Sequence, residues 1–154
     1  MTYNESVDFI NKESDRLLKR VNGELTEQNM EQLSLDEHIL LAYKYLRDEV
    51  MEGGFIQLIQ NGYGPYVLLG PLPMLLKKQL GLKKFGQFLF DVKREYSLHK
   101  DELEADKTDE EFMAQYEQFE TLNEYGDEYL DDYEEIITPA IAEYFQNQVN
   151  EQKN

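Results

Sequence analysis

Residues 34–55, SLDEHILLAYKYLRDEVMEGGF, predict a long α-helix with a defined beginning and end. Ser34 and Glu37 have the spacing of a capping box, in which each side chain accepts a hydrogen bond from the other residue's free backbone N–H. Apolar side chains then recur at helical intervals, at Ile39, Tyr43, Leu46 and Val50. Paired glycines are costly inside a helix and allow a sharp turn, so we expect this helix to end at Gly53-Gly54.

The same helical period continues on both sides of this stretch. Apolar residues at three- and four-residue spacing predict further helices over 7–21, 55–60, 75–80, 82–96, 109–122 and 129–145. Thr108 and Glu111 form a second capping box, Gly126 separates the last two helices, and Pro139 either kinks the final helix or begins a new one capped by Thr138. Glycine and proline are frequent over 63–73, which predicts a loop.

Alternating strand patterns and internal repeats are absent from the sequence, so we predict an all-α fold. The chain has 154 residues, and 41% of them are hydrophobic, which is enough for one packed core. We therefore expect a single compact domain over 1–154 with about six to seven helices. The start of the chain lacks a signal-peptide pattern, and glycine and proline interrupt its most apolar stretch, 66–76. These features predict a cytoplasmic protein without a membrane partner.

Charge is the most informative part of the composition. The 32 acidic residues outnumber the 15 basic ones, and the net charge is −17. Such a charge disfavours direct binding to nucleic acid, which has the same sign. Residues 101–135 contain 16 acids and one base, whereas 61–100 carry seven bases and two acids. If 101–135 formed one helix, its charges would stand about 3.3 Å apart, close to the roughly 3.4 Å of one DNA strand.

Helical phase predicts where these acids point. On a continuous helix, Glu110, Glu117, Glu120 and Glu124 fall within an arc of roughly 80°. An aromatic and apolar stripe lies opposite them, made of Phe112, Tyr116, Phe119 and Leu122. A second acidic cluster surrounds Tyr129 and Tyr133 and consists of Asp127, Glu128, Asp131, Asp132, Glu134 and Glu135. We take these ten acids as candidate partner-binding residues, although charge runs are often only solvated faces.

Catalytic and metal-binding patterns are weak. Glu49 and Glu52 with His38 are the best candidates for acid–base chemistry, but one helical turn separates the two carboxylates, as expected at a helix end. The residues after Asp101 do not supply the ligand positions of a calcium-binding EF-hand loop. Because the chain contains no cysteine, disulfides and thiolate metal sites are excluded. The sequence predicts a protein that is not an enzyme and that has neither cofactor nor metal.

Several motifs resemble a known family. The chain contains Glu49-Val50-Met51-Glu52-Gly53-Gly54-Phe55 followed by Asn61-Gly62, then 80–85 (LGLKKF), 119–123 (FETLN), Tyr129 and Tyr144. In these motifs it resembles a bacterial acidic, all-helical family whose described member is a DNA-mimic protein and whose other members are mostly of unknown function. The resemblance covers about 33–150, which leaves 1–32 as an N-terminal helical extension and 151–154 as a tail.

The resemblance implies an α-helical fold and, for the described member, carboxylates placed like DNA phosphates on the DNA-binding face of a helix-turn-helix regulator. Within the motif, Glu49, Gly53, Gly54 and Phe55 are expected to be structural, forming a tight turn and a core anchor. The mimicking carboxylates belong to no motif, so the candidates of this chain come from its charge distribution.

Two binding functions fit these observations. The leading hypothesis is an acidic module that occupies the basic surface of a DNA-binding protein. The alternative is an immunity-type inhibitor that neutralises a basic toxin domain. The basic segment 77–100 either packs beside the acidic segment in the same molecule or supports a salt-sensitive homodimer.

Overall fold

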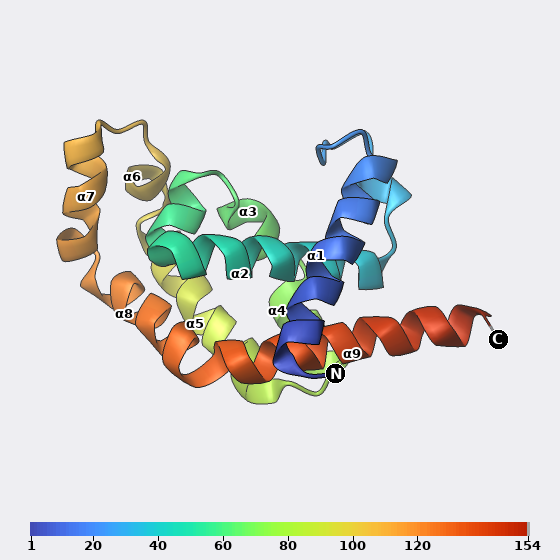
Figure 1. Cartoon of the computed structure of the whole chain (residues 1–154). Coiled ribbons are helices and arrows are strands. Elements are labelled where there is room, and N and C mark those ends of the chain that lie inside the picture. The colour runs from blue at the N-terminus through green and yellow to red at the C-terminus, as the bar shows by residue number, and fades with distance from the viewer. Residues whose placement is uncertain (154) are drawn as a thin grey trace. The chain divides into compact units, whose positions relative to one another are not determined.

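The computed structural model describes residues 1–153, with side chains up to Glu151, and all regular structure in this part of the chain is helical (Figure 1). Asn154, the end of the expected tail 151–154, lies outside it. Seven helices have seven residues or more: α1 (Tyr3–Arg20), α2 (Leu35–Gln60), α4 (Leu72–Lys78), α5 (Lys83–Leu98), α7 (Asp109–Gln118), α8 (Glu120–Glu128) and α9 (Glu134–Lys153). The shorter elements are η1 (Met30–Gln32), α3 (Gly64–Val67), α6 (Lys100–Glu104) and the π-helical turn η2 (Tyr129–Tyr133). The all-α prediction is confirmed.

The chain forms two compact units, which we describe separately. One comprises residues 1–44 together with the chain from Glu135 onward, and the other comprises Tyr45–Glu134. The chain passes between the units within α2 and at the start of α9. The expected single domain stays a prediction.

The first unit is built from α1, the beginning of α2 and most of α9. Its helix α1 begins earlier than expected, because Thr2 and Glu5 form a capping box that the apolar pattern did not indicate. The rings of Phe9 and Phe145 meet edge to face at 6.2 Å, which joins α1 to α9. Helix α9 continues through Pro139 without a restart, and the Thr138 side chain hydrogen-bonds the Tyr43 hydroxyl at 2.8 Å instead of capping a new helix.

The second unit contains the rest of α2 and the elements from α3 to η2. Gly53 and Gly54 leave helical geometry as predicted, and Gly54 has a φ of 76°, which favours glycine. The capping box at Thr108 is also confirmed, as is the one at Ser34 in the first unit. The expected loop over 63–73 instead contains α3 and the start of α4, because proline at the first turn of a helix removes only an N–H that would have no partner there.

The acidic segment differs most from expectation. The helix predicted over 109–122 breaks at Phe119, whose φ of −109° and ψ of 61° are not helical. Helix α8 then runs through Gly126, where we expected a helix end. An additional helix, α6, precedes this region. The carboxylates that the sequence placed on one helix therefore lie on two helices, α7 and α8.

Candidate partner-binding surface

Helix α8 and η2 form an amphipathic segment with regular inner and outer faces. The buried positions are Leu122, Gly126, Tyr129 and Tyr133, at successive spacings of four, three and four residues. The acids at 120, 124, 127 and 131 are spaced in the same way, and each lies two residues before one of the buried positions. All four acids are exposed. This offset places them on the opposite side of the helix from the core.

An aromatic cluster holds the buried face against α5. The Tyr133 ring stacks on Phe88 with centroids 4.7 Å apart and lies 5.2 Å from Phe85. Tyr125 meets Phe88 edge to face at 5.7 Å, and Tyr129 lies 6.1 Å from Phe85. Each aromatic pair of this kind stabilises the fold by about 0.5–1.5 kcal/mol beyond the contribution of the apolar area that it buries. The acids are thus carried by an anchored segment.

The glycine turn in α2 contributes a second anchor. The Tyr116 hydroxyl of α7 donates a hydrogen bond to the Gly53 carbonyl at 2.6 Å. Gly126 of α8 packs directly on the turn, since a Cβ at this position would lie 3.3 Å from the Gly54 Cα. Both acidic helices are therefore seated on this turn.

The other two motif residues support the turn from within the unit. The Glu49 carboxylate accepts hydrogen bonds from Gln57 at 2.8 Å and from Asn61 at 3.0 Å, which ties the helix before the glycines to the residues after them. Phe55 is fully buried, and its ring lies 6.0 Å from that of Phe88. These contacts account for the motif and leave Glu49 bonded to two amides.

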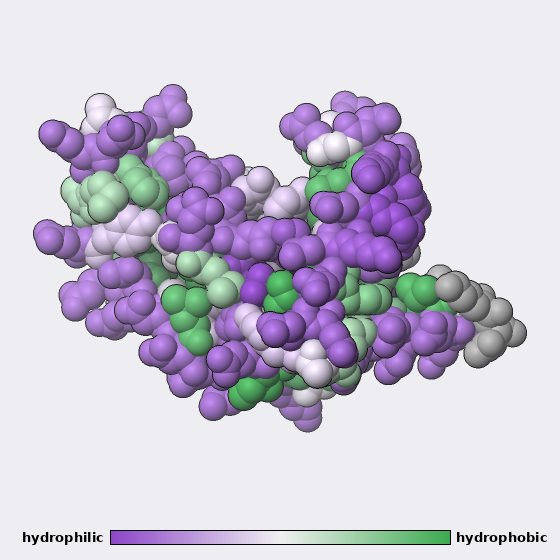
Figure 2. All heavy atoms as spheres, in the orientation of Figure 1, coloured by the Kyte–Doolittle hydropathy of each residue, from purple (hydrophilic) through white to green (hydrophobic). Residues whose placement is uncertain are grey.

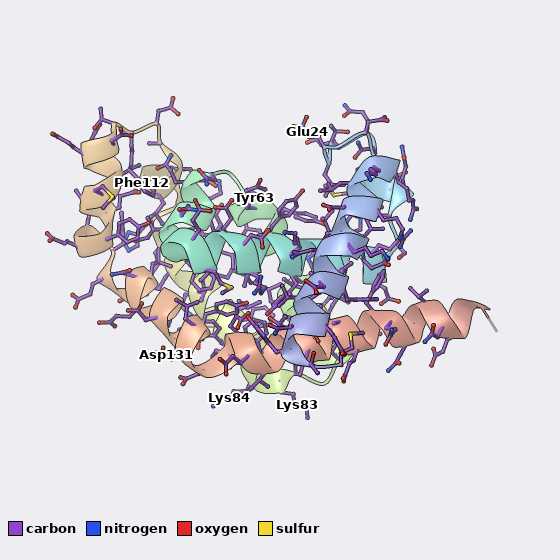
Figure 3. The ribbon with its side chains drawn as sticks, viewed as in Figure 1. Glu24, Tyr63, Lys83, Lys84, Phe112 and Asp131 are labelled. Carbon is purple, nitrogen blue, oxygen red and sulfur yellow. The ribbon has the colours of Figure 1, made fainter. Side chains whose placement is uncertain are left out.

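Six exposed carboxylates on α8 and η2 form what we call the α8 acidic surface: Glu120, Glu124, Asp127, Glu128, Asp131 and Asp132. The fourteen residues from Glu120 to Tyr133 span about 21 Å, or about one charge per 3.5 Å, compared with about 3.4 Å along a DNA strand. Figure 2 shows hydrophilic side chains along the outer edge of α8 beside an apolar patch, and Asp131 projects outward from η2 (Figure 3). The sequence contains no lysine or arginine from 108 to 150.

Helix α5 adds carboxylates that sequence reasoning assigned to a basic segment. Burial raises the pKa of Tyr125, and the negative charges of Asp91, Glu95 and Glu128 raise it further. The pKa of Tyr133 is raised by burial and then by Glu128, Asp132 and Asp91. Acids from α5 and α8 thus act on the same tyrosines. Asp91 and Glu95 add negative charge near these tyrosines only because α5 and α8 pack together. Spacing along the chain therefore did not indicate their effect.

The remaining candidates separate into distinct groups. Glu110 and Glu117 are exposed on α7, so they do not share one helix with Glu120 and Glu124 as predicted. Glu135 is exposed but belongs to the first unit, and we describe it apart from the others.

Glu134 corrects the set of candidates. Its side chain is 4% exposed and lies 2.9 Å from the Arg47 guanidinium. A buried and paired carboxylate does not present its charge to a partner, so we leave Glu134 out of the proposed surface.

The basic segment 77–100 makes mostly local contacts. Arg94 pairs with Asp91 at 3.1 Å, and Lys100 pairs with Glu104 at 2.5 Å. At the start of α5 (Figure 3), the Lys84 ammonium lies 5.9 Å from the Tyr133 ring, beside the α8 acidic surface. The homodimer stays a prediction.

Within residues 1–153, no group of three or more histidine or carboxylate side chains is placed to hold a metal ion. None of the helices in the same part of the chain is both long and apolar enough to cross a membrane.

The fold and the surface define an acidic, all-helical protein whose exposed carboxylates gather on helices seated on a glycine turn. The chain belongs to the DMP19-like protein family, whose model matches residues 31–148. It is 32% identical over 123 residues to the DNA mimic protein DMP19 of Neisseria meningitidis serogroup B, an alignment that covers 79% of this chain and 73% of that protein. The resemblance inferred from the motifs is confirmed, and α1 lies outside the matched segment.

Proposed function

We propose that this protein is a DNA mimic that binds the DNA-binding surface of a basic protein, a helix-turn-helix regulator being the foremost candidate. The observation that carries the proposal is the α8 acidic surface, with six exposed carboxylates at a spacing close to that of phosphates along one DNA strand. The homologous protein named as a DNA mimic supports the same conclusion.

Binding would replace DNA phosphates by carboxylates. Lysine and arginine side chains that normally contact the DNA backbone would pair with Glu124, Asp127, Asp131 and their neighbours, and the field of the surface would speed association. Such pairs weaken as salt increases. Rigid placement favours affinity because less conformational entropy is lost on binding, and the aromatic cluster with the glycine turn provides that rigidity.

The test is affinity capture from a lysate of the source organism at low salt, with stepwise salt elution and mass spectrometry. The decisive variant neutralises four acids together: Asp127→Asn, Glu128→Gln, Asp131→Asn and Asp132→Asn. A matched control loses the same charge from exposed acids of the first unit: Asp15→Asn, Glu24→Gln, Glu27→Gln and Glu31→Gln.

We expect the wild type and the control to retain a DNA-binding protein that salt releases and duplex DNA displaces, and the four-site α8 variant to lose it. Equal capture by both variants would refute the assignment to the α8 acidic surface. Capture of a single basic toxin domain would favour the immunity-type inhibitor instead.

A further inference from the structure

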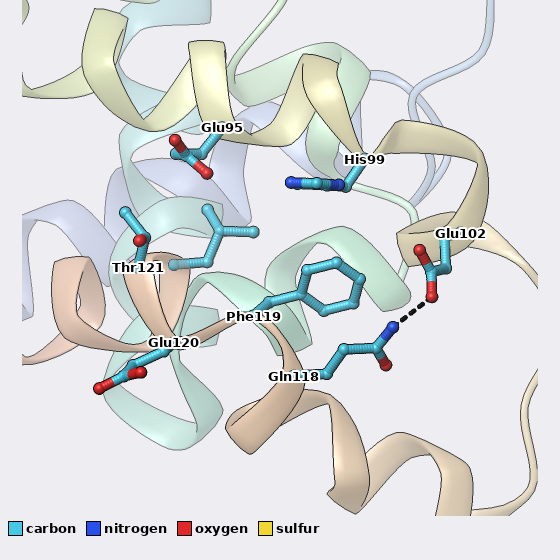
Figure 4. A pocket seen from close by; sticks show the side chains of 8 residues that line it. Glu95, His99, Glu102, Gln118, Phe119, Glu120 and Thr121 are labelled. Atoms are coloured by element: carbon cyan, nitrogen blue, oxygen red, sulfur yellow. Dashed lines mark hydrogen bonds between the residues drawn. The ribbon is translucent and has the colours of Figure 1, made fainter.

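A half-open pocket of about 350 Å³ adjoins the α8 acidic surface (Figure 4). Its walls come from α5, α6 and the junction between α7 and α8. Three carboxylates line it, those of Glu95, Glu102 and Glu120, and no lysine or arginine is among the lining residues. The pocket thus combines a recess with net negative charge.

The pocket has a ring-lined apolar wall. Phe119 and Leu122 are 7% and 1% exposed, and the His99 ring lies 5.2 Å from the Phe119 ring at an angle of 51°. Figure 4 shows that Glu95 and His99 extend from one side toward Phe119 and Thr121, whereas Glu120 points away from them. Glu95 and Glu102 are therefore the carboxylates that can act inside the pocket.

The charges of these two carboxylates are not cancelled by a neighbouring cation. The Gln118 amide donates a hydrogen bond to Glu102, which orients this carboxylate while leaving its charge in place. Lys107 is close by, but its ammonium bonds the backbone carbonyl of Glu102. In the part of the chain that the structure describes, no salt bridge involves Glu95 or Glu102.

We propose that this pocket receives an arginine side chain of the basic partner, an inference that rests on the proposed function. A guanidinium is planar, so it can lie against the His99 and Phe119 rings while its N–H groups reach the carboxylates of Glu95 and Glu102. A lysine ammonium lacks both the plane and the fork of donors. Arginines in such recesses commonly dominate binding energy, so the pocket would slow dissociation while the α8 acidic surface speeds association.

The test uses small probes, so it needs no identified partner. Capped arginine (N-acetyl-arginine methylamide) and its lysine counterpart are titrated into ¹⁵N-labelled protein, and the amide shifts of residues 99, 119 and 121 are followed. The variants Glu95→Gln and Glu102→Gln each remove one charge from the pocket. His99→Ala removes an exposed ring, and Glu27→Gln, at an exposed acid of the first unit, is the control of equal charge.

We expect saturable shifts around the pocket with the arginine probe, and binding weakened about threefold to fivefold in Glu95→Gln and Glu102→Gln. Binding should also be weaker for the lysine probe and in the His99→Ala variant, whereas Glu27→Gln should match the wild type. Shifts of equal size for both probes, spread along α8 and unchanged in Glu95→Gln, would overturn the pocket. The proposed function would survive that result if the four-site α8 variant still lost its partner, so the two failures are distinguishable.

Discussion

Glu134 is buried and paired with Arg47, whereas the neighbouring acids are exposed. Substitution of Glu134 tests whether its role is structural. Its carboxylate lies 2.9 Å from the Arg47 guanidinium, and the two side chains are 4% and 12% exposed. Removing one partner of a buried ion pair costs about 3–5 kcal/mol, because the remaining charge is left without compensation. Arg47 also lies 3.9 Å from Asp48, whose side chain is 44% exposed, and this weaker pair retains part of the compensation.

We therefore expect Glu134→Ala to reduce the free energy of unfolding by about 2–4 kcal/mol, below the full cost of an orphaned charge. For a chain of this size, such a loss lowers Tm by roughly 10 °C. Asp131→Asn removes the same charge from an exposed side chain, so it should change Tm by little and weaken partner capture instead.

The assay is thermal and urea unfolding followed by circular dichroism, together with the capture experiment at a temperature where both variants are folded. A double variant, Arg47→Met with Glu134→Leu, should recover stability because it leaves no buried charge. A Tm of Glu134→Ala within about 1 °C of the wild type would refute the structural role of the pair. Loss of partner capture by a folded Glu134→Ala protein would return this residue to the binding surface.

Three further predictions concern the scaffold. Gly54→Ala should cost about 1–3 kcal/mol in urea unfolding, because a φ of 76° with a ψ of −176° is strained for a side chain; an unchanged midpoint would contradict this. Thr108→Ala removes the side-chain cap of α7 and should lower the free energy of unfolding by about 1 kcal/mol in the same urea assay. An unchanged free energy of unfolding would show that the capping box is dispensable. Burial and a hydrogen bond to Asp36 raise the pKa of Tyr144 to about 12, above the unfolded value near 10, so stability present below pH 10 should fall as pH rises toward 12. Urea midpoints between pH 9 and pH 11 should show a smaller fall in Tyr144→Phe, and an equal fall would exclude this contribution.

Helix positions were largely predictable because their signals are local. A capping box is formed within four residues, as at Ser34 and Thr108, and a glycine pair ends a helix through its own backbone freedom. The same locality explains one error. Glycine often ends a helix, yet Gly126 lies inside α8, where a Cβ would stand only 3.3 Å from the Gly54 Cα and glycine therefore fits the tight contact.

Charge density along the chain could also be counted in advance, whereas the composition of the surface could not. Glu134 and Glu135 are adjacent and chemically identical, yet the first is buried and paired with Arg47, which is 87 residues away in the sequence, whereas the second is exposed. The charges of Asp91 and Glu95 act on Tyr125 of α8 because α5 packs against α8 through aromatic rings. The sequence by itself determined an acidic chain of helices and most of their limits. Which carboxylates are exposed and unpaired depends on contacts between distant residues, and only the tertiary structure decided it.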